Sequence, residues 1–208
     1  MSDRGPIIYI IDDDNSVRSA VSLLLKAHGL RAESFERSDI FLARKRPRVP
    51  SCLILDIQLP GMNGLDLQDA MKQRGIPIPI IFITGHGNIP MSVKGMKAGA
   101  IDFLPKPFTE DKLLAAIAQA VAKSKTQLRE LAELGKIRRR VKTLSPRELE
   151  VFRLVAKGML SKQIARKRGI SLQTIKVHRG RVMRKMQAKT VTELIRFAQK
   201  AGITPFPR

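Results

Sequence analysis

The sequence has little cysteine and no long apolar run. Its only cysteine is Cys52, so no intrachain disulfide can form, and a reducing compartment suits the chain. No apolar run approaches the length of a membrane-spanning helix, and the N-terminus lacks the pattern of a signal peptide. We therefore expect a cytoplasmic chain of one or two domains with no membrane anchor, in which Cys52 is a small buried strand residue.

Acidic residues become scarce after residue 124. Residues 1–124 contain 16 Lys and Arg against 13 Asp and Glu, whereas residues 125–208 contain 23 against 5. The C-terminal part thus carries +18 of the net charge of +21. Such an excess makes nucleic acid the first partner to consider and an anionic membrane surface the second. The membrane alternative would use the basic cluster at 136–142, but no lipidation signal or second anchor accompanies that cluster.

Strand and helix patterns alternate in the N-terminal part. Strands are predicted at 7–11, 31–35, 52–55, 78–83 and 100–104, and helices over 16–28, 38–45, 65–73, 89–98 and from about 110. This alternation is typical of βαβ units. We therefore expect an α/β fold with a doubly wound, five-stranded parallel sheet.

Polar side chains stand where four of these strands end. Asp12 and Asp13 follow the first strand, Asp56 the third, Thr84 the fourth and Lys106 the fifth. Open α/β sheets bind ligands at the carboxyl ends of their strands, so these groups should gather at one edge. Clustered carboxylates repel one another, and a divalent cation is the usual remedy. A lone Asp after a strand is usually a turn former, so the prediction depends on all five positions together.

These five residues and the step from Lys106 to Pro107 resemble the phosphorylation site of two-component receiver domains, and the resemblance covers residues 6–122. It implies that Asp56 is the nucleophile that takes a phosphoryl group from a sensor histidine kinase. Lys106 and Thr84 would contact the phosphoryl oxygens, and the Lys106–Pro107 bond is expected to be cis.

The same resemblance implies a metal site. Mg²⁺ or Mn²⁺ would be held by the carboxylates of Asp13 and Asp56 and by the backbone carbonyl of Gln58, with Asp12 acting through water. Gln58 also bears on a rival interpretation, an aspartyl-phosphate phosphatase. Such enzymes carry a second Asp two residues after the nucleophile, where this chain has Gln58. We therefore expect no enzyme beyond the receiver's own phosphotransfer and dephosphorylation.

Further residues match the receiver family. Phe103 matches the switch aromatic, although a plain core Phe is an equally open interpretation. The stretches TGHG at 84–87 and AGA at 98–100 narrow the resemblance to the FixJ-like branch. We expect His86, in the first stretch, to be an exposed loop residue with no catalytic role. Relatives dimerise on phosphorylation through the face that corresponds to residues 89–104, where Val93 and Lys97 match positions used in that contact.

The usual loop residues are missing between the two parts. Seven positions recur at alternating spacings of three and four: Leu114, Ile117, Val121, Ser124, Leu128, Leu131 and Gly135. The pattern predicts that the last receiver helix continues through a helical linker at 123–142. It is consistent with a coiled-coil stripe and equally with an ordinary amphipathic helix packed on its own domain.

The pattern is helical throughout from residue 143, with helices predicted over 146–157, 162–168, 172–186 and 192–201. The stretches LSPRELEV at 144–151, KQIA at 162–165 and TIKVHR at 174–179 resemble the LuxR/NarL-type DNA-binding domain over 143–203. The resemblance implies an all-α, four-helix helix-turn-helix domain whose third helix enters the major groove of promoter DNA.

Individual DNA contacts follow from this second resemblance. Lys176, Val177 and His178 would contact DNA, and Lys162 and Thr174 would touch phosphates. Gly180 stands where some relatives have a long polar side chain, so base reading is expected to move to two nearby cations, Arg181 and Arg184. The predicted chain is thus a receiver at 1–122, a helical linker at 123–142 and a DNA-binding domain at 143–208. The two resemblances together imply that it acts as a transcriptional response regulator.

Overall fold

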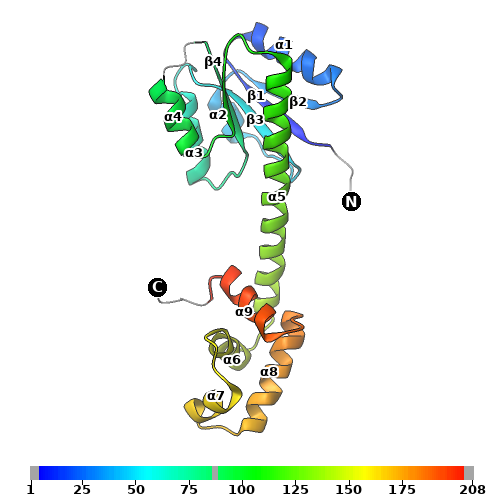
Figure 1. Cartoon of the computed structure of the whole chain (residues 1–208), viewed down its shortest axis with the longest axis vertical. Helices are drawn as coiled ribbons and strands as arrows, with labels where there is room; N and C mark the ends of the chain where they lie inside the picture. Colours follow the sequence, from blue (N-terminus) through cyan, green and yellow to red (C-terminus); the bar gives the residue numbers. More distant parts are fainter. Residues whose placement is uncertain (1–4, 86–88, 204–208) are drawn as a thin grey trace. The chain divides into compact units, whose positions relative to one another are not determined.

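The computed structural model describes residues 5–85 and 89–203 (Figure 1). The chain forms two compact units, Met1–Arg129 and Glu130–Arg208. Within the described residues, none of the helices combines the length and apolar character needed to cross a membrane.

The first unit is built on a parallel sheet of five strands in the order β2-β1-β3-β4-β5. The strands are β1 (Ile7–Ile11), β2 (Arg31–Phe35), β3 (Ser51–Asp56), β4 (Ile80–Thr84) and β5 (Asp102–Pro105). The helices between them are α1 (Asn15–Ala27), α2 (Ser38–Ala43), α3 (Gly64–Gln73) and α4 (Ile89–Lys97), and α5 (Glu110–Lys142) follows β5. The alternation predicted from the sequence is confirmed.

Successive strand residues point to opposite faces of the sheet, which gives two cores. Tyr9, Leu53 and Phe82 belong to the core covered by α2, α3 and α4. Ile10 and Ile54 belong to the core covered by α1 and α5. Because both faces are covered, the central strands are apolar at nearly every position, as the runs in the sequence indicate. The sheet is doubly wound, as predicted.

Two strands begin later than predicted. β4 begins at Ile80 because Pro77 and Pro79 have no backbone N–H to donate to a ladder. β5 begins at Asp102 because the N–H of Ala100 is used at the end of α4, where it donates to the carbonyl of Gly95 at 3.1 Å. Predicted helix ends agree with the structure within a residue or two.

α5 is one continuous helix of 33 residues, as predicted. Along the stripe of alternating spacing, Ile117 and Val121 lie in the sheet core and Ser124 is buried. The Ser124 hydroxyl accepts a hydrogen bond from the N–H of Ser51 at 3.0 Å. This half of the stripe therefore packs on its own domain, as one of the two alternatives expects. Leu131 is half-exposed, and the domain boundaries at 122 and 142 stay a prediction.

The second unit packs the end of α5 with four helices, α6 (Pro146–Ala156), α7 (Ser161–Arg168), α8 (Leu172–Met186) and α9 (Val191–Lys200). Ser145 and Glu148 form a capping box at the start of α6, and Ser171 caps α8. Gly169 takes the left-handed conformation that ends α7, with φ of 63°. These signals fix the helix-turn-helix arrangement of α7 and α8.

Candidate functional site: an acidic strand edge and a basic helix

The acidic residues predicted at the strand ends lie together. β1 and β3 are neighbours, with Ile11 opposite Leu55, so the residues that follow them meet at one edge. One carboxylate oxygen from each of Asp12, Asp13 and Asp56 lies within 4.8 Å of the others. Asp12 and Asp56 are buried, whereas Asp13 is exposed. Three carboxylates at this spacing form a donor set that fits a hard divalent cation.

Lys106 joins two of these carboxylates. Its Nζ lies 2.7 Å from Oδ2 of Asp12 and 2.6 Å from Oδ2 of Asp56. Burial would lower the pKa of Lys106, but its hydrogen bonds and charge interactions with the two carboxylates leave the pKa raised. Burial raises the pKa of Asp12, although the Lys106 ammonium opposes that shift. The Lys106 ammonium thus offsets the repulsion between the two buried carboxylates, Asp12 and Asp56.

The other predicted receiver residues lie around this cluster. Thr84 is fully buried at the end of β4, and its carbonyl accepts from the N–H of Lys106 at 2.7 Å. The N–H of Gln58 donates to Oδ1 of Asp56 at 2.9 Å. The Lys106–Pro107 bond is cis, as predicted. Phe103 is half-buried beside the ring of Phe82, with centroids 6.3 Å apart. His86 and Gly87 lie outside the described residues.

Two further residues, which sequence patterns alone do not reveal, also hold this edge. Arg18 donates to the carbonyls of Asp12 and Asp13 at 2.8 and 2.9 Å. A Cβ added at Gly64 would lie 2.5 Å from the carbonyl oxygen of Asp56. In the sequence alone, Arg18 looks like an ordinary cation on a helix, and Gly64 like one of several glycines in turns. Their roles depend on a fold that brings them back to the strand ends.

α4 has exposed residues where the dimer face was predicted. Val93 and Met96 are each 44% exposed, and Lys97 is exposed beside them. Gly95, on the inner side, would place a Cβ 2.9 Å from the ring of Phe82. The predicted dimer residues are therefore accessible, while the opposite side of α4 packs closely on the sheet.

α8 separates its apolar and basic residues. Ile175, Val182 and Met186 are fully buried. Six of the residues predicted to contact DNA are exposed. They are Lys162 at the start of α7 and Thr174, Lys176, Val177, Arg181 and Arg184 on α8. His178 is half-buried, and its Nδ1 has no hydrogen-bond partner among the described residues. Arg179 donates to the Ser161 hydroxyl at 2.8 Å and so ties α8 to α7.

Two family models match the chain. Residues 8–118 match the response regulator receiver domain, and residues 142–198 match the bacterial regulatory proteins of the luxR family. The chain belongs to the FixJ/NarL-type response regulators. This response regulator is 44% identical to the response regulator protein TodT of Pseudomonas putida over 200 residues, which cover 96% of this chain and 88% of TodT.

Two further comparisons cover nearly the whole chain. The response regulator is 40% identical to the transcriptional regulatory protein FixJ of Bradyrhizobium diazoefficiens, over 98% of both chains. It superposes on the solved structure of the response regulator StyR with a TM-score of 0.79 and 39% identity, over 95% of this chain and all of that one. It is thus a transcriptional response regulator of a two-component system, whose domains imply a kinase partner and DNA binding.

Proposed function

We propose that Asp56 is the phosphoacceptor of this response regulator. A carboxylate oxygen of Asp56 attacks the phosphorus of a phosphohistidine on the kinase. The bond from phosphorus to the histidine nitrogen breaks, and an aspartyl phosphate forms. The observation that carries the proposal is the convergence of Asp12, Asp13 and Lys106 on this one carboxylate.

A divalent cation, Mg²⁺ or Mn²⁺, would be held by Asp13, Asp56 and the carbonyl of Gln58. When bound, it screens the charges of two anions that must approach each other. Asp12 would act on the metal through water, and Lys106 is near enough to move from Asp56 to a phosphoryl oxygen. The Thr84 hydroxyl would then hydrogen-bond the same group. We infer no chemistry beyond this phosphotransfer and the hydrolysis of the aspartyl phosphate, in which water takes the phosphoryl group as inorganic phosphate and the Asp56 carboxylate is restored.

Replacing the nucleophile tests this assignment. With a small phosphodonor and Mg²⁺, the protein should gain one phosphoryl group, measured as an intact-mass increase. Asp56→Asn should gain none, because an amide cannot act as this nucleophile. Asp69→Asn is the matched control, since Asp69 is an exposed carboxylate on α3, and it should be labelled like the wild type. Full labelling of Asp56→Asn at another residue would reject the assignment.

We further propose that α8 reads promoter DNA in the major groove. Val177, exposed among cations, suits contact with a thymine methyl group, and Lys176, Arg181 and Arg184 suit base edges and phosphates. His178 would take part through Nε2. Lys162 and Thr174 would touch phosphates. Support comes from the buried inner face of α8, which leaves this basic face outward.

Phosphorylation is proposed to drive dimerisation through α4. Phosphoryl contacts to Thr84 and Lys106 would favour one arrangement of the face that includes Val93 and Lys97, with Phe103 turning inward as the switch. Only differential contacts of this kind can move such an equilibrium. A dimer presents two recognition helices to two half-sites, so the second contact is effectively intramolecular.

A further inference from the structure

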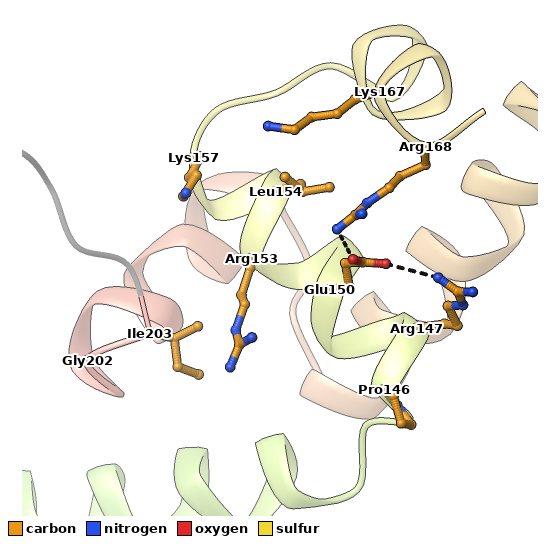
Figure 2. Close-up of a pocket in the computed structure, with 10 residues that line it drawn as sticks. All are labelled: Pro146, Arg147, Glu150, Arg153, Leu154, Lys157, Lys167, Arg168, Gly202 and Ile203. Carbon is orange, nitrogen blue, oxygen red and sulfur yellow. Dashed lines mark hydrogen bonds and ion pairs between the residues drawn. The ribbon is translucent and has the colours of Figure 1, made fainter. Parts of the chain in front are cut away.

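The second unit carries a groove that the proposed DNA contacts do not use. It has a volume of about 750 Å³ and is lined by one side of α6, by Lys167 and Arg168 at the end of α7, and by Gly202 and Ile203 after α9 (Figure 2). We call it the α6 groove. Its size is within the usual range for ligand and peptide side-chain pockets.

The α6 groove lies on the side of α6 that faces away from α8. Arg147, Glu150, Leu154 and Lys157 recur at spacings of three and four, so they share one face of the helix. Phe152, on the other face, is buried in the core, and Glu148 there accepts a hydrogen bond from Lys185 of α8 at 2.6 Å. A duplex read by the exposed face of α8 is therefore not positioned to fill the groove.

Five cations and one carboxylate surround the groove. Glu150 pairs with Arg168 and, at 3.5 Å, with Arg147, as the dashed lines in Figure 2 mark. The other three cations, Arg153, Lys157 and Lys167, are exposed and form no ion pair with any residue that the structure describes. Like charges gathered in this way repel one another, so an anionic occupant would be favoured.

The floor of the groove is apolar. Leu154 is 7% exposed, and Ile203 is half-buried at the opposite wall. An apolar floor under a cationic rim suits a chain that alternates carboxylates with apolar side chains. A bare phosphate or a sugar-phosphate backbone would leave the floor unused. We propose that the α6 groove binds an acidic, partly apolar peptide segment of a partner protein.

Peptide binding to the full-length protein tests this proposal. The probe is a short fluorescein-labelled peptide of Glu and Leu residues, followed by fluorescence anisotropy. The wild type should bind it more tightly than matched Glu/Ser and Gln/Leu peptides. The double variant Arg153→Ala, Lys157→Ala should bind the Glu/Leu peptide about fivefold more weakly, because each exposed ion pair contributes only modestly.

The matched control is Arg138→Ala, Arg139→Ala, which removes two exposed cations of the same unit outside the groove. It should bind the peptide like the wild type. The groove variant should also retain wild-type affinity for a duplex selected by the wild-type protein, which verifies its fold. Three outcomes would overturn the proposal: no peptide binding by the wild type, equal losses in the two double variants, or a groove variant that loses duplex binding as strongly as peptide binding.

Discussion

Glu148 links the start of α6 to the recognition helix. Its carboxylate accepts hydrogen bonds from the N–H of Ser145 at 2.8 Å and from Nζ of Lys185 at 2.6 Å. The hydrogen bond from Lys185, together with that from Ser145, holds the pKa of Glu148 below its usual value. One side chain thus caps α6 and ties α8 to it.

Glu148→Gln should destabilise the second unit at neutral pH by about 1.5–3 kcal/mol, the usual contribution of a hydrogen bond to a charged group. Because the folded pKa is lowered, this stabilisation is fully present above the unfolded pKa of roughly 4.3. It is lost as the pH falls through the folded pKa. Urea unfolding at pH 7 and at pH 3, followed by NMR signals of α6, should show the full difference from the wild type at pH 7 and a smaller difference at pH 3. Glu130→Gln, an exposed control, should show none at either pH.

Single residues also show how far the sequence could predict the site. The carboxylates could be predicted to lie together because strands can be recognised from local pattern and parallel strands end at the same edge of a sheet. The double contact of Lys106 and the clamp of Arg18 depend on tertiary distances that spacing does not encode. Cys52 is fully buried, as predicted, and burial raises the pKa of its thiol to about 12.

At the scale of elements, the close approach of α3 to β3 depends on Gly64. A Cβ there would meet the backbone of Asp56 and also lie 2.9 Å from Cα of Ile57. The backbone cannot yield as a flexible side chain could, so Asp56, the proposed phosphoacceptor, would have to move. Ser124, a polar residue in the otherwise largely apolar stripe on α5, similarly acquires a role only because β3 is adjacent and Ser51 donates to its hydroxyl.

Gly64→Ala should therefore destabilise the receiver by about 1–3 kcal/mol, as overpacking does, and slow phosphoryl uptake. Gly180→Ala is the control. The position on α8 is open, with nothing within 4 Å of an added Cβ, so alanine should stabilise that helix by about 1 kcal/mol. Urea unfolding of both variants measures the change in the free energy of unfolding, which should fall for Gly64→Ala and rise for Gly180→Ala. Normal stability and normal phosphorylation of Gly64→Ala would contradict the steric argument.

The exposed face of α4 carries the dimer prediction. Val93→Asp should be phosphorylated normally but stay monomeric in sedimentation, because a carboxylate would be buried in the contact without a partner. Leu23→Asp on α1 is the control, since Leu23 is 70% exposed on another helix, and it should dimerise like the wild type on phosphorylation. A dimer of equal affinity with and without phosphodonor would exclude the mechanism.

At the scale of the whole molecule, charge is divided between the two units. The excess of cations after residue 124 predicts that DNA binding weakens steeply as salt rises, through release of counterions.

Lys162→Ala should weaken binding to all duplexes alike. Val177→Ala should reduce the binding free energy for a selected duplex by about 1 kcal/mol, and the loss should be confined to one base step, as direct readout requires. Titrations against selected and random duplexes at several salt concentrations separate these effects. Equal losses on both duplexes for Val177→Ala would refute base reading.

Each unit is made from one uninterrupted stretch of chain, with α5 as the only element common to both. This arrangement affects how the protein is synthesised. Domains generally fold as units during translation, at about 5–20 residues per second. The last strand of the receiver sheet ends at Pro105, well before the recognition helix begins at Leu172. The sheet and its acidic edge can therefore assemble while the basic helices have yet to leave the ribosome, whose own RNA would otherwise attract them.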